Sequence, residues 1–164
     1  MRGNAAGAAS VRWLRVARLM AWTGMLAATA CHSRSASMEP QTIEVRADRG
    51  WQETGVVVDG RTPFTLRDVS GEIRDEDTNI RGGAGSDYVC GKADCCEPMP
   101  HVRRSALIAR VGDDVFDVSN GGRFTRRAKG PLFLRINDCD AGLRDNSGAL
   151  TVKFVPDTGL ATGY

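Results

Sequence analysis

The chain has 164 residues, 22 basic and 20 acidic, for a formal net charge of +2. Four of the basic residues, all Arg, lie in the first thirty positions, which leaves 18 basic against 20 acidic residues in the remainder. No basic stripe with interleaved aromatic residues occurs there, which argues against nucleic-acid binding, and the remainder is long enough for one domain with a substantial core.

The first thirty residues have the composition of an export signal. Four arginines precede the apolar run LMAWTGMLAATA, which ends in small residues before Cys31 and is too short for a membrane-spanning helix of about 20 residues. The segment ATAC resembles a bacterial lipobox, although Leu is usual where Ala28 stands. We therefore expect a signal peptide over residues 1–30, lipidation of Cys31 and a membrane anchor in the cell envelope, at the outer membrane or cell surface. Cleavage after Ala30 without lipidation would instead give a secreted protein.

The part that follows is expected to be all-β. The polar segment HSRSASMEPQ predicts a flexible tether over residues 31–41. Beyond it, short apolar and β-branched segments alternate with turn signals, and none shows three turns of helical periodicity. The expected strands are residues 43–47, 54–59, 64–69, 105–112, 115–118, 131–136 and 149–155. We expect one domain over residues 42–157, a β-sandwich of the jelly-roll or galactose-binding-domain-like type with a barrel as the alternative, and a loose tail over 158–164.

Residues 75–100 form a long segment without strand or helix periodicity, and they carry three of the four cysteines of the expected domain. Cys90, Cys95, Cys96 and Cys139 are an even set, and four cysteines allow three disulfide pairings, one of which ties the CGKADCC segment to Cys139. A zinc site with His101 is the alternative. The C-x4-C-C spacing matches no common structural zinc pattern, and thiols of exported proteins usually oxidise, so we expect disulfides.

The segment INDCDAGLRDNSG lies between two apolar strands and holds three carboxylates and two carboxamides. Calcium takes about six to eight oxygen ligands, of which Asp138, Asp145 and Asn146 could supply several. Gly142 would let the backbone turn so that a carbonyl points inward. The same composition also describes an ordinary turn that binds no ion.

Three stretches resemble the PA-IL family, the calcium-dependent galactophilic lectins of bacteria and their domain relatives. They are WQETGVVVDGRTPFTLRDVSGEI (51–73), LIARVG (107–112) and GPLFLRINDCDAGLRDNSGALTVKF (130–154). The last is the most specific, because both the residue types and the loop length agree with the closing hairpin of that family.

The resemblance implies a calcium ion and the residues that hold it. The implied ligands are the side chains of Asp138, Asp145 and Asn146 and the backbone carbonyls of Gly142 and Asp75. In the family, two adjacent sugar hydroxyls complete the calcium shell, which implies carbohydrate contacts at Asp138, Gly142 and Asp145.

A galactoside is one candidate ligand, but the His and Gln that contact galactose in the family have no counterpart, since residues 75–100 contain neither. Tyr88 in that segment is the candidate for a further sugar contact. Trp51 is expected to pack in the structure rather than to stack on sugar.

We expect a lipid-anchored, calcium-dependent carbohydrate-binding module. The alternative is a structural or protein-interaction sandwich of the cell envelope whose calcium only rigidifies the loop. No nucleophile elbow, Walker loop or zinc-protease helix is present, so we expect no enzyme. The charge runs at His101–Arg104 and Asp75–Asp77 are expected to be solvated.

Overall fold

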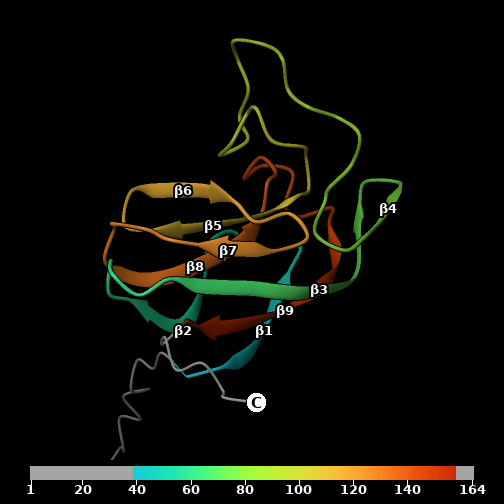
Figure 1. Ribbon diagram of the computed structural model, residues 1–164. Coiled ribbons are helices and arrows are strands. Elements are labelled where there is room, and N and C mark those ends of the chain that lie inside the picture. Colours follow the sequence, from blue (N-terminus) through green and yellow to red (C-terminus); the bar gives the residue numbers. More distant parts are fainter. Residues whose placement is uncertain (1–38, 158–164) are drawn as a thin grey trace, which may run out of the picture. The chain divides into compact units, whose positions relative to one another are not determined.

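The computed structural model describes residues 39–157, so the expected signal peptide, the lipidation at Cys31, most of the tether and the tail lie outside the described residues. The described part contains nine strands and no helix, and therefore no helix that could cross a membrane (Figure 1). The strands are β1 Gln41–Arg46, β2 Gln52–Val58, β3 Phe64–Asp75, β4 Thr78–Arg81, β5 Leu107–Val111, β6 Asp114–Asp117, β7 Gly122–Phe124, β8 Gly130–Ile136 and β9 Ser147–Pro156.

The strands form two antiparallel sheets, which confirms the expected β-sandwich and excludes a barrel. One sheet has the order β1-β9-β3-β4, with the short β7 also paired to β3, and the other has the order β2-β8-β5-β6. Neighbours in the sheets are mostly not neighbours in the sequence. As a result, the ends of β3, β5, β8 and β9 contribute residues to one site.

The core lies between the sheets and is built by alternating residues, as the sequence pattern predicts. In β1 the side chains of Ile43 and Val45 are buried, and in the neighbouring β9 those of Leu150, Val152 and Phe154 are fully buried. Burying an aliphatic or aromatic side chain of this size contributes roughly 1.5–3 kcal/mol. The rings of Phe64 and Phe154 lie 5.4 Å apart between centroids, within the range of favourable aromatic pairs.

Two strands, β4 and β7, were not predicted, and β3 is twice as long as predicted. β4 lies inside the segment expected to be irregular, and its four residues bury only Ile80. β3 continues six residues beyond its expected end at Val69. The sequence pattern did not reveal this extension, because a bulge between Arg67 and Ser70 shifts the register of β3 against β9 and interrupts the alternation of buried residues. This extension carries the chain to Asp75.

The start of β9 is held very close to β3 by Gly148. This residue has φ of 83°, and a Cβ atom there would lie 2.3 Å from the carbonyl oxygen of Glu72. Only glycine fits both the left-handed conformation and the contact. The close approach places Asn146, two residues earlier, near the end of β3.

Candidate functional site

Four strand ends bring charged and polar residues together at one end of the sandwich. Asp75 is the last residue of β3, Asp138 follows β8 by two residues, Asn146 directly precedes β9, and Arg104 and Ser105 precede β5. β3 and β9 belong to one sheet, and β5 and β8 to the other. The site therefore lies where the two sheets meet, beneath the long connection from β4 to β5 that Figure 1 shows in yellow-green.

Asp138 is the buried centre of the acidic loop and is fully inaccessible to solvent. Its Oδ1 accepts a hydrogen bond from the amide of Cys139 at 2.7 Å, and its Oδ2 accepts one from Nδ2 of Asn146 at 2.8 Å. The carbonyl oxygen of the Asn146 side chain is buried and has no hydrogen-bond partner among the described residues. A buried polar atom without a partner costs about 1–3 kcal/mol, so a cation or a water molecule bound at this oxygen would be stabilising.

The Asp75 side chain is also buried, contrary to the prediction of a solvated charge run at this position. Its carboxylate accepts a short hydrogen bond from the hydroxyl of Ser105. Burial raises the pKa of Asp75, while the bond from Ser105 and the positive charge of Arg104 act in the opposite direction. The sequence could not show this burial, because it depends on Ser105, 30 residues away.

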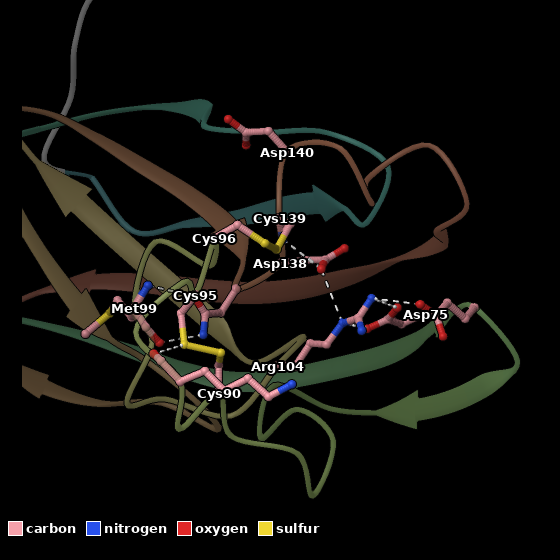
Figure 2. The surroundings of a disulfide bond; sticks show 12 residues. Asp75, Cys90, Cys95, Cys96, Met99, Arg104, Asp138, Cys139 and Asp140 are labelled. Atoms are coloured by element: carbon pink, nitrogen blue, oxygen red, sulfur yellow. Dashed lines mark hydrogen bonds and ion pairs between the residues drawn. A yellow bond between two sulfur atoms is a disulfide. The ribbon is translucent and has the colours of Figure 1, made fainter.

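Arg104 lies between the two buried carboxylates, as Figure 2 shows. Its Nε is 3.1 Å from Oδ2 of Asp75 and 3.3 Å from Oδ1 of Asp138, and its Nη2 is 3.2 Å from Oε1 of Glu76. Burial lowers the pKa of Arg104, but the three carboxylates outweigh it and the net pKa is raised. The prediction that the HVRR segment is solvated loop charge is therefore wrong for Arg104.

The other predicted calcium ligands differ in burial and in their contacts. Gly142 does not adopt a left-handed conformation, but a Cβ atom there would lie 3.1 Å from Oδ2 of Asp138, so a larger residue would require the Asp138 carboxylate to shift slightly. Its carbonyl accepts a hydrogen bond from the amide of Asp145 at 3.3 Å. Asp145 itself is exposed. Of the three predicted side-chain ligands, Asp138 and Asn146 are thus buried and in contact, whereas Asp145 lies at the surface.

Two buried residues outside the predicted site, Arg135 and Asn137, hold the acidic loop in place. Arg135 donates to the carbonyl of Asp138 at 2.7 Å and to the carboxylate of Asp140 at 2.7 Å. Asn137 donates through Nδ2 to the carbonyls of Met99 and Val102 and accepts at Oδ1 from the amide of Met99. An Arg and an Asn at the end of an otherwise apolar strand are the signal that could have revealed them, because buried polar residues need partners.

Disulfides fix the long connection against the acidic loop. Cys96 pairs with Cys139, and Cys90 pairs with Cys95, as Figure 2 shows. This is one of the pairings that the sequence left open, and it joins the CGKADCC segment to the residue next to Asp138. The backbone of Asp138 is therefore restrained by Arg135 on one side and by this disulfide on the other.

An open cavity of about 380 Å³ adjoins this cluster. Its lining residues are Asp75, Glu76, Thr78, Ser86, Asp87, Tyr88 and Arg104. Tyr88 is 49% exposed, as a residue that contacts a ligand from solvent would be. Trp51 lines no part of this cavity and instead packs under the guanidinium groups of Arg110 and Arg135, at 4.8 and 5.5 Å from its ring.

Comparison with known proteins identifies a structure of the same fold. No protein-family model and no curated protein matches the sequence. A solved structure, described as "EclA N-terminal domain; PllA-like lectin", is 23% identical to this chain, with a TM-score of 0.58. The match covers 74% of this chain and 100% of that domain. At this level of identity the likeness shows that the chain has the β-sandwich fold of that lectin domain.

Proposed function

We propose that this protein is a lectin-like module that binds carbohydrate through a calcium ion held by the acidic loop. One observation carries the proposal: the buried side-chain oxygen of Asn146 has no partner and lies beside the buried carboxylate of Asp138. Both belong to the same loop, and the second buried carboxylate, Asp75, lines the open cavity. Hard oxygen donors of this kind are those that calcium prefers.

The residues that would hold the ion are the side chains of Asp138 and Asn146, with the carbonyls of Gly142 and Asp75 and the surface carboxylate of Asp145. A bound calcium ion supplies free coordination positions for two adjacent sugar hydroxyls. The remaining recognition would come from residues that line the cavity. Tyr88 offers an apolar ring face, and Thr78, Ser86 and Asp87 offer hydrogen-bonding groups.

Two further arguments support carbohydrate as the ligand class. The protein with the same fold is itself described as a lectin domain, and the closing hairpin resembles that of the PA-IL family. Neither argument favours galactose in particular, because the lining of the cavity contains no His and no Gln. A galactoside therefore stays one candidate among several sugars with adjacent hydroxyl groups.

The proposal places the module in the cell envelope, anchored to a membrane by lipid on Cys31. It rests on the basic and apolar composition of residues 1–30 and on the ATAC segment. Mass spectrometry of the mature N-terminus tests it, since an unmodified N-terminus that starts at Cys31 would indicate secretion instead.

A second function is favoured by the disulfide between Cys96 and Cys139, which ties the long connection to the acidic loop. In this alternative, the module is a structural or protein-interaction sandwich of the cell envelope, and its calcium only rigidifies the loop. It predicts that calcium raises the melting temperature while no glycan binds.

Isothermal titration with a panel of monosaccharides, in calcium and in chelator, separates the two functions. We expect sugar binding in calcium only, and we expect Tyr88→Ala to weaken sugar binding about tenfold without changing calcium binding, because it removes only the ring contact. Val89→Ala is the matched control, since Val89 is similarly exposed at 44% but lines a different cavity. Sugar binding that persists in chelator would contradict the proposed mechanism.

A further inference from the structure

We infer that Arg104 is a built-in counter-ion that competes with calcium for Asp75 and Asp138, so that the ion binds only when the guanidinium moves out. This inference rests on the calcium site of the proposed function. It assigns a role to a residue that belongs to neither the predicted ligands nor the predicted sugar contacts.

The contacts of Arg104 place it where a cation between the two buried carboxylates would stand. A single nitrogen, Nε, is within 3.3 Å of both Asp75 and Asp138. That nitrogen is buried, yet it makes no hydrogen bond of good geometry within residues 39–157. The Nη2 atom, by contrast, donates hydrogen bonds to Oδ1 of Asp75 and to Oε1 of Glu76, each at 3.2 Å. Arg104 is therefore bound to Asp75 and Glu76 by directional bonds, but to Asp138 by charge alone.

The charge at this point is not balanced by Arg104 alone. One positive charge faces the carboxylates of Asp75, Asp138 and Glu76, all within 3.3 Å of its nitrogens. A divalent ion held by the carboxylate of Asp138 and the carbonyl of Asp75 would bring two positive charges to the buried pair, but it would repel a guanidinium that stayed between the two carboxylates. The two cations thus exclude each other.

The guanidinium of Arg104 can move away from Asp138 toward the open cavity. The Arg104 side chain is 26% exposed and lines the open cavity, whereas Asp138 is fully buried. Glu76, which already contacts Nη2, is 63% exposed and lies on the solvent side of the pair. Rotation of Arg104 outward would keep the contact with Glu76 while it releases Asp138.

Titration of calcium alone into the disulfide-bonded full chain tests the inference without any sugar. Arg104→Gln removes the competing charge and keeps a long polar side chain, so we expect its calcium Kd to fall at least about tenfold. Arg103→Gln is the matched control, because Arg103 pairs with the surface residue Asp87 outside the buried cluster. We expect that control to stay within about twofold of the wild-type Kd.

A calcium affinity of Arg104→Gln equal to or weaker than that of the wild type would overturn the inference. Should that variant fail to fold in chelator, the Nε resonance of Arg104 in the wild-type chain provides the second measurement. We expect it to shift on calcium addition while that of Arg103 does not, and calcium binding without such a shift would also overturn the inference.

The same titrations separate this inference from the proposed function. Calcium binding by Arg104→Gln but not by the wild type would support the competition and contradict calcium-dependent sugar binding by the native chain. Equal calcium binding by both, together with calcium-dependent sugar binding, would support the function and contradict the competition. Absence of calcium binding in both proteins would contradict both.

Discussion

Replacement of Asp138 by Asn tests the proposed ion site most directly. The change keeps the size of the side chain but removes its charge and one of its two accepting oxygens. In the structure, those oxygens accept from the amide of Cys139 and from Asn146, and one of them faces Nε of Arg104. We expect lower stability in chelator and loss of the response to calcium.

The expected loss of stability follows from these contacts. Hydrogen bonds to a charged acceptor contribute about 1.5–3 kcal/mol each, against about 0.5–1.5 kcal/mol for neutral ones. The side chain of Asn146 can rotate and use its unpaired oxygen to accept from the new NH2 group, and Arg104 keeps Asp75 and Glu76. The net destabilisation should therefore be about 1–3 kcal/mol, which lowers the Tm of a domain of this size by roughly 3–10 °C.

Thermal unfolding of both proteins in calcium and in chelator measures the two effects separately. Asp113→Asn is the matched control, because Asp113 is an exposed carboxylate in the turn at the far end of β5, and its replacement should change stability by less than about 0.5 kcal/mol. At a calcium concentration of about 100 Kd, the wild type should gain about 2.7 kcal/mol. If Asp138→Asn is as stable as the wild type in chelator and still gains stability from calcium, the proposed site is wrong.

The disulfides and an exposed turn give two further predictions. The disulfide Cys96–Cys139 closes a chain loop with a sequence separation of 43, whereas Cys90–Cys95 closes one with a separation of only 5. Replacing both cysteines of a pair by Ser should therefore lower the free energy of unfolding by about 4 kcal/mol for the first pair and about 2 kcal/mol for the second, through the entropy of the unfolded chain. Chemical denaturation measures both losses, and equal losses would contradict this prediction. Hydrogen bonds, first of all from backbone amides of the following turn, lower the pKa of Asp59 from 3.8 to about 2. Its contribution to stability should be complete above pH 3.8 and disappear as the pH falls through about 2. An NMR titration of its carboxyl carbon with a midpoint near 3.8 would contradict this assignment.

Much of the fold could be predicted because it depends on local periodicity. All seven expected strands are present, since the alternation in segments such as Ile43–Ala47 and Leu150–Phe154 marks one face for the core. β4 and β7 could not be predicted, because each is short and is stabilised by pairing with β3 rather than by its own pattern. The extension of β3 to Asp75 was hidden by the bulge after Arg67.

The candidate site, like the fold, contains residues that the sequence predicted and contacts that it could not predict. The residues of the acidic loop stand out in the sequence. Asp138 and Asn146, which are in contact, are only eight positions apart in this loop. Asp75 entered the predicted set only through the family resemblance, and only as a backbone ligand. The structure adds its buried side chain and brings Ser105 to it.

By itself, the sequence determined that this chain forms an all-β domain and that it gathers hard oxygen donors in the loop before its last strand. Both follow from patterns within a few residues, which burial and turn chemistry translate directly into structure. Only the tertiary structure decided which cysteines pair and which charges meet. Arg104 reads as one more solvated cation in HVRR, and it becomes the partner of Asp138 because β5 and β8 are neighbours in one sheet while β3 of the other sheet ends beside them. The charge that we propose to compete with calcium therefore belongs to Arg104, which lies 34 positions before Asp138.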